Sequence, residues 1–231
     1  MKNNNQIIYG LIVTIAIFVL ANFIGSKMSI WPDALPPYFV THSVMLLGSI
    51  GVIILLSKSV NYKIALPKFK MILRPILFGL LASIVINISL SVLTKVMGGN
   101  LEPHPAFKIM SPLQVLVFIF IYASIAEEIL FRGFLLNILS PLKEKGIRIF
   151  KHQVSIAVII SGFTFGLAHL VLIFAGVGVF FIIKTVIFTS ILGLIAGYYQ
   201  EKYSNNAFAI IVHMAGNFMA VIGALLMSLN A

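Results

Sequence analysis

The sequence predicts an all-α membrane protein: a polytopic bundle of about seven transmembrane helices around a membrane-embedded polar cavity. Of its 231 residues, 60% are hydrophobic and only 10% are charged, whereas a soluble domain carries about 25% charged residues. Apolar runs of about 20 residues, the length that crosses a bilayer, recur along the chain. Ionisable residues also occur inside some of these runs, where they are costly and usually face a bundle interior or a wet cavity.

The apolar runs define the predicted spans, and polar or basic segments separate them. One run, residues 112–139, exceeds a minimal span and must tilt or protrude. A segment punctuated by glycine and proline, residues 95–111, precedes it as a linker. We expect a single domain, residues 1–231, with its motif-bearing core at about 112–229. The predicted spans are about 7–24, 39–56, 75–93, 112–139, 154–174, the run after Gly178 to about 199, and 207–229.

The positive charges predict how the chain is oriented in the membrane. The formal net charge is +10, but most Lys and Arg fall in short segments between apolar runs, so we expect no nucleic-acid partner. Eleven of them fall on the N-terminal side of seven alternating spans and three on the other. The positive-inside rule then places the N-terminus in the cytoplasm. We expect the protein to lie in the cell (inner) membrane. An eighth span, made by dividing residues 154–199, is the alternative, but it would break this agreement.

Some classes of protein are excluded by absent features. The chain contains no cysteine, which excludes disulfides, thiolate metal sites and cysteine nucleophiles. The first apolar run is long enough to span and lacks a small-residue cleavage site, so we expect no cleavable signal peptide.

Three ionisable residues lie within the fourth run, at Glu127, Glu128 and Arg132. Residues four apart share a helical face, so Glu128 and Arg132 are expected to pair, whereas Glu127 points elsewhere. We therefore predict that Arg132 neutralises Glu128, which then has a structural part, and that Glu127 stays free to accept a proton.

Two later runs carry polar groups with the same spacing. Phe165 and His169 share one face of the fifth run, and His213 and Asn217 share one face of the seventh. A lone histidine in an apolar helix is more often a core residue, but three spans with polar groups indicate a shared site. The other histidines lie in loops or near span ends, and we expect them to be non-catalytic: His42, His104 and His152.

Small residues occur four apart in the fifth and sixth runs, at Gly162/Gly166 and Gly193/Gly197. Such pairs let helix backbones approach closely in lipid. Close packing of these two runs would hold His169 in place.

These residues together could activate water. Glu127 is the candidate base, and His213 and Asn217 could donate to a developing oxyanion. Glutamate and histidine are also zinc ligands, but the sequence has no H-E-x-x-H, so zinc stays an open alternative and no metal ligands are assigned. The predicted catalytic residues are Glu127, Glu128, His169, His213 and Asn217, with Arg132 as supporting partner.

The three motifs also carry a family resemblance. Glu-Glu-x-x-x-Arg at 127–132, Phe-x-x-x-His at 165–169 and His-x-x-x-Asn at 213–217 resemble the motifs of the CAAX protease and bacteriocin-processing (CPBP, Abi) family of intramembrane endopeptidases. The resemblance covers about residues 124–220. It implies that Glu127 and His169 activate the attacking water, that His213 and Asn217 form the oxyanion hole, and that no metal takes part.

The resemblance also implies the partners. The substrate would be a membrane-associated protein or peptide, such as a prenylated protein or one that bears a leader, met within the lipid bilayer. A non-enzymatic alternative uses the same charges as a ligand or proton site, in a bacteriocin immunity protein or a small proton-coupled transporter. Inverted repeats with broken helices, common in transporters, are not evident, because the candidate groups all lie in the second half of the chain.

Overall fold

The computed structural model describes residues 3–32, 34–149 and 151–229. Within these residues seven helical segments are long and apolar enough to cross a membrane, which confirms the predicted number of spans. Six of them are α1 (Asn3–Lys27), α2 (Tyr38–Leu55), α3 (Phe69–Val96), α6 (Ile156–Ala168) with its 3₁₀ continuation η5 (His169–Ala175), α7 (Val179–Tyr203) and α8 (Ala207–Leu229). The fourth span is one continuous helix built from α4 (Pro112–Gln114), η2 (Val115–Ala123), α5 (Ser124–Glu128) and η3 (Ile129–Leu136).

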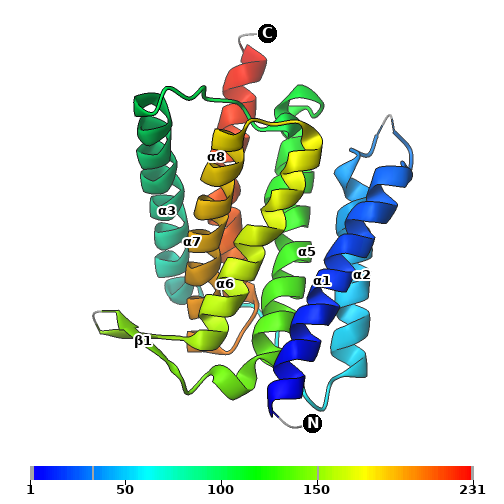
Figure 1. Ribbon diagram of the computed structural model, residues 1–231, viewed down its shortest axis with the longest axis vertical. Helices are drawn as coiled ribbons and strands as arrows, with labels where there is room; N and C mark the ends of the chain where they lie inside the picture. The colour runs from blue at the N-terminus through cyan, green and yellow to red at the C-terminus, as the bar shows by residue number, and fades with distance from the viewer. Residues whose placement is uncertain (1–2, 33, 150, 230–231) are drawn as a thin grey trace.

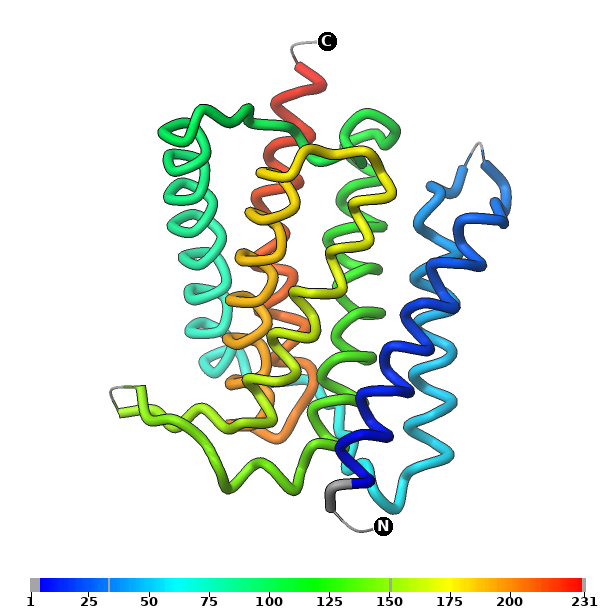
Figure 2. Tube along the Cα trace, viewed as in Figure 1, coloured from blue at the N-terminus to red at the C-terminus, as the bar shows by residue number. Residues whose placement is uncertain are grey.

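The connections between the spans lie at two opposite ends of the bundle (Figure 1). We call one the basic end: it holds the start of α1 and the connections 56–68, 137–155 and 204–206. The other, the linker end, holds the connections 28–37, 97–111 and 176–178 and the end of α8. The Cα trace in Figure 2 shows the linker 97–111 crossing over the linker end, from α3 to the start of the fourth span. This linker contains a 3₁₀ turn, η1 (Pro105–Lys108).

The first two spans form a hairpin that stands at one side of the bundle (Figure 1). They pack on each other and on the second half of the fourth span. Met45 and Ile53 from α2 join Leu130, Phe134 and Leu135 of η3 in the largest buried apolar cluster. The fourth span therefore lies between this hairpin and the other helices.

The fourth span has wide π-type turns on both sides of the two glutamates, in η2 and η3. Such turns use i→i+5 hydrogen bonds and are frequent at functional sites. A wider turn places more residues in the same axial length. All eight residues of η3 are buried.

The fifth and sixth spans approach closely, as their small residues predict. A Cβ atom added at Gly193 would lie 3.1 Å from the Cα atom of Gly162 and would overlap Nη2 of Arg132. At Gly166 it would lie 2.8 Å from the carbonyl oxygen of Val186. Only glycine fits at these positions, and the space at Gly193 is filled by the Arg132 guanidinium.

A short antiparallel hairpin departs from the all-α prediction. Strands β1 (Gly146–Ile149) and β2 (His152–Ser155) pair with Ile147 opposite Val154, in a segment that the sequence predicted as a basic loop. The basic residues of this segment favoured a loop in the sequence analysis, although β-branched residues at alternate positions are typical of a strand. A 3₁₀ turn, η4 (Ser140–Leu142), precedes the hairpin.

The contact between α6 and α7 predicts an asymmetric pair of alanine substitutions. Gly193→Ala should destabilise the protein by about 1–3 kcal/mol, because the new methyl group has no space. Gly51→Ala is the matched control: a Cβ there meets nothing within 4 Å, so it should be neutral or slightly stabilising. Thermal unfolding in detergent measures both, and equal melting temperatures for the two variants would contradict the tight crossing.

Candidate active site

A cavity of about 410 Å³ lies among the helices and brings the predicted groups together. Glu127 of α5, His169 of η5, and His213 and Asn217 of α8 all line it. They come from three spans, as the sequence predicted. Helices α1, α2 and α3 and the linker supply the remaining wall, together with α7.

Glu127 contacts two imidazoles. Its Oε1 lies 3.3 Å from Nε2 of His42, and its Oε2 lies 3.8 Å from Nε2 of His213. Nδ1 of His42 donates to the carbonyl oxygen of Tyr38 at 2.8 Å, because a carbonyl can only accept. Nε2 is thus the atom of His42 that can share a proton with Glu127.

Glu128 points away from Glu127 and into the protein, as its spacing from Arg132 predicts. Its Oε1 accepts from Nη1 of Arg132 at 2.8 Å and from Nδ1 of His213 at 2.8 Å. Both Glu128 and Arg132 are completely buried. The guanidinium also lies over the ring of Phe165, with Cζ 4.5 Å from the centroid, a favourable cation–π position.

The charges of this cluster balance with one additional proton. Two carboxylates and one guanidinium leave one net negative charge, and unpaired charge is expensive in a low-dielectric interior. His42 and His213 both approach Glu127. A proton held between Glu127 and one of these imidazoles would make the cluster neutral.

His169 lies at the point where α6 passes into η5. Its Nδ1 donates to the carbonyl oxygen of Phe165 at 3.0 Å, so in the neutral ring Nε2 is the proton acceptor. The Phe165 ring contacts both imidazoles edge-on, with centroids 5.0 Å from His169 and 5.3 Å from His213. Phe165 therefore spaces the two histidines apart on one wall of the cavity.

Asn217 is held by the fourth span. Its Nδ2 donates to the hydroxyl of Ser124 at 3.2 Å and lies 3.5 Å from the carbonyl oxygen of Ile119. The amide nitrogen that the oxyanion prediction requires is therefore already bonded in this structure. Donation to a substrate needs one of these two bonds to open.

The linker brings further polar groups to the cavity. His104 and Glu102 both line it, and a carboxylate oxygen of Glu102 accepts from the backbone N–H of Gly178 at 3.0 Å. Nδ1 of His104 accepts the N–H of Ala106. The pKa of His104 is lowered to about 4, first by burial and then by the nearby His169, while Glu127 acts in the opposite direction. His104 is therefore neutral at pH 7.

The sequence analysis did not place His42 in the site, because this residue lies near the start of the second span. The structure places it against Glu127, and it is buried. Its position inside an apolar run was the available signal, since ionisable groups at such depth usually have a function. The remaining loop histidine, His152, lies on β2 and bonds the hydroxyl of Tyr198, away from the cavity residues.

The zinc alternative can be compared with the same geometry. In residues 3–32, 34–149 and 151–229, no three His, Asp or Glu side chains are grouped so as to hold a metal ion. Each carboxylate oxygen of Glu127 instead faces one imidazole nitrogen, that of His42 or that of His213.

A seven-span helical bundle with carboxylates and imidazoles facing an internal cavity defines a class: an integral membrane protein with an intramembrane polar site. Residues 109–219, which include all three motifs, match the family described as type II CAAX prenyl endopeptidase Rce1-like. This match supports the CAAX protease (CPBP, Abi) family that the motifs predicted, which is a family of proteases. No curated protein and no solved structure matches the chain.

The buried ion pair predicts a non-additive pair of substitutions. Arg132→Met leaves the Glu128 carboxylate buried without its cation and should cost about 3–5 kcal/mol of stability. Glu128→Gln together with Arg132→Met removes both charges and should recover much of this loss. Unfolding of both variants in detergent tests the pair. A single variant as stable as the double variant would show that Arg132 does not neutralise Glu128.

Proposed function

We propose that the protein is an intramembrane endopeptidase in which Glu127 activates water to hydrolyse a peptide bond of a membrane-associated protein or peptide. The observation that carries the proposal is the position of Glu127: it lines the cavity and is bonded through histidines, whereas Glu128 is committed to Arg132. The family match supports the reaction class.

The mechanism follows from which atoms are free to take a proton. A water between Glu127 and His169 loses a proton to one of them, and its oxygen attacks the carbonyl carbon of the substrate. The proton is then delivered to the amide nitrogen as the C–N bond breaks, which gives a carboxylic acid and an amine. His42 and His213 keep a proton available beside Glu127 through contacts at 3.3 and 3.8 Å.

His213 and Asn217 are proposed to stabilise the oxyanion. Nδ1 of His213 donates to the Glu128 carboxylate, so an Nε2–H donor requires His213 to be an imidazolium. Glu128 supports this charge directly. Glu128 then contributes through His213 and Arg132, which refines its place among the predicted catalytic residues to that of a positioning residue.

We also propose that the N-terminus is cytoplasmic. The ten described Lys and Arg residues of the basic end compare with four at the linker end, and cytoplasmic segments carry the excess of positive charge. The basic-end residues are Lys58, Lys63, Lys68, Lys70, Arg74, Lys143, Lys145, Arg148, Lys151 and Lys202.

Substitution of the proposed base tests the mechanism directly. Glu127→Gln should lower cleavage at least about 100-fold, because the amide cannot accept the proton, while the melting temperature stays near that of the wild type. Comparison of membrane peptides in cells that carry either form identifies substrates, and a reconstituted assay with such a peptide measures the rate. Unchanged turnover in Glu127→Gln would exclude this role. Proton-coupled uptake by proteoliposomes without cleavage would favour a transporter.

A second variant tests the contact between Glu127 and His42 of α2. His42→Gln should lower the rate about 10- to 100-fold, because Glu127 loses a proton-sharing contact that fixes its position. His152→Gln is the matched control, since His152 bonds Tyr198 on the hairpin, and it should cleave like the wild type. Equal rates for the two variants would show that the His42–Glu127 contact has no part in the reaction.

A further inference from the structure

The proposed cavity is polar towards one end of the bundle. Glu102 and His104 of the linker line it, as do Lys184 and Thr185 within the first two turns of α7. All four lie at or near the linker end, because α7 begins there. Nζ of Lys184 donates to the hydroxyl of Ser91, near the end of α3. These side chains can form hydrogen bonds with water and with the polar groups of a peptide along this part of the wall.

Towards the basic end, the structure is closed by buried side chains. Leu130, Phe134, Leu135 and Leu136 of η3 each have no exposed surface, and Phe131 has 1%. They pack together with residues of α2 and α6 in one apolar cluster. Among the described residues, this buried apolar cluster lies between Glu127 and the basic end.

Loop residues cover this closure from outside. A Cβ atom at Gly133 would lie 2.9 Å from the ring of Tyr62, so the tyrosine rests directly on η3. The side chain of Asn205 bonds both backbone groups of Ala65, and the N–H of Asn206 donates to the carbonyl oxygen of Lys63. The connection 56–68 is thereby tied to the turn between α7 and α8.

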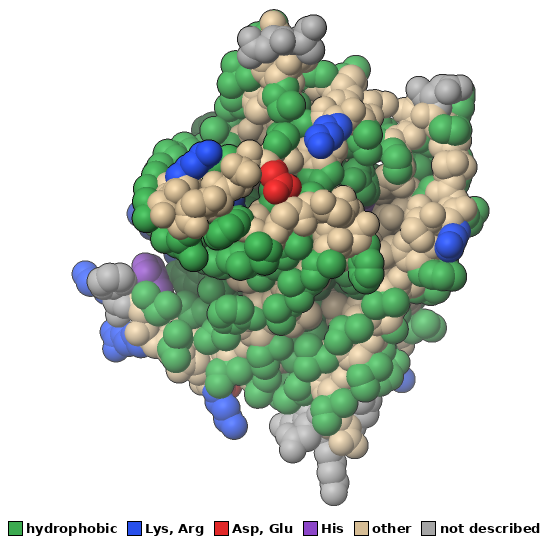
Figure 3. All heavy atoms as spheres, turned by 45° about the horizontal axis from the view of Figure 1, so that its top comes forward, with side chains coloured by type: hydrophobic (Ala, Val, Ile, Leu, Met, Phe, Trp, Pro, Cys, Tyr) green, Lys and Arg blue, Asp and Glu red, His purple; other side chains and the backbone are tan. Residues whose placement is uncertain are grey.

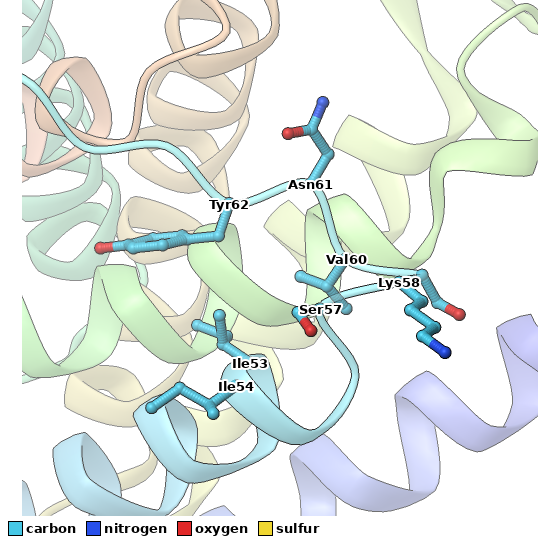
Figure 4. Close-up of a pocket in the computed structure, with 8 residues that line it drawn as sticks. Ile53, Ile54, Ser57, Lys58, Val60, Asn61 and Tyr62 are labelled. Atoms are coloured by element: carbon cyan, nitrogen blue, oxygen red, sulfur yellow. The ribbon is translucent and has the colours of Figure 1, made fainter.

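A hollow of about 590 Å³ does exist at the basic end, between the end of α2 and the following loop (Figure 4). Ile53, Ser57, Lys58 and Tyr62 are among its lining residues. It shares no lining residue with the cavity that holds Glu127. The two spaces are therefore separate.

The surface charge distinguishes the same two ends. Figure 3 turns the linker end towards the viewer and shows a face with predominantly hydrophobic side chains, acidic atoms near its middle and scattered basic groups. Its described basic residues are Lys27, Lys95, Lys108 and Lys184, against ten at the basic end. The positive-inside rule assigns the linker end to the non-cytoplasmic side.

We propose that the site is reached from the non-cytoplasmic side of the membrane, through the linker end. This inference rests on the proposed endopeptidase function and narrows its substrate class. The substrate is a hydrophobic peptide segment whose scissile bond lies in the outer half of the bilayer or emerges from it. A protein anchored by a lipid on the cytoplasmic face would not reach Glu127.

Cysteine accessibility tests this proposal, because the natural chain has no cysteine. Four single variants are compared: Asn100→Cys in the linker, Asn61→Cys at the basic end, and Thr185→Cys and Ala220→Cys in the cavity wall. Each is treated in right-side-out vesicles with a membrane-impermeant maleimide, before and after permeabilisation. Labelling after denaturation in SDS gives the total, and the melting temperature confirms the fold of each variant.

We expect both cavity cysteines and Asn100→Cys to be labelled in sealed vesicles, and Asn61→Cys only after permeabilisation. Cavity cysteines that react only after permeabilisation, or not at all before denaturation, would overturn the proposal. Labelling of Asn61→Cys but not Asn100→Cys in sealed vesicles would overturn it as well, through the orientation. None of these results depends on cleavage, so loss of the proposed function would be seen separately, as absent turnover in the wild type.

Discussion

The ion pair between Glu128 and Arg132 is the interaction on which the rest of this site depends. Each charge alone would be costly at membrane depth, and both side chains are completely buried. The pair is sustained by a 2.8 Å bond, by the Phe165 ring under the guanidinium, and by the space that Gly193 leaves for it. Fourth, fifth and sixth spans are therefore fixed relative to one another by a single charged group.

The helix that carries this pair is adapted to it. The wide turns of η3 are accompanied by side-chain donors from other elements: Ser161 of α6 bonds the carbonyl oxygen of Phe131 at 2.7 Å, and Gln200 of α7 bonds that of Arg132 at 2.8 Å. Asn137 also donates to the carbonyl oxygen of Arg132 at 3.1 Å. In lipid, a backbone acceptor left without a partner is costly. These three polar side chains stabilise the irregular helix and lock it between α6 and α7.

Much of the architecture could be predicted from hydrophobic periodicity and i,i+4 spacing. The seven spans and the Glu128–Arg132 pair follow from them, because both depend on local geometry. Other features depend on how distant helices meet. Nothing in the sequence indicated that Glu128 also accepts from His213, 85 residues away, or that His42 contacts Glu127. The π-type turns of the fourth span were not predicted either, because apolar periodicity does not distinguish an α-turn from a π-turn over so few residues.

The residues that line the cavity come from two parts of the chain, one inside and one outside the segment that matches the family. Every motif residue falls within the family-matched segment 109–219. The cavity wall, however, also takes Asn22 from α1, His42 from α2, Asn87 from α3 and His104 from the linker, all outside that segment. In the proposed function, the matched segment supplies the reacting groups, while the first three spans and the linker shape the cavity around them. His42 belongs to both parts, because it lines that space and contacts Glu127. The first helical pair thus contacts the proposed base and also forms part of the cavity wall.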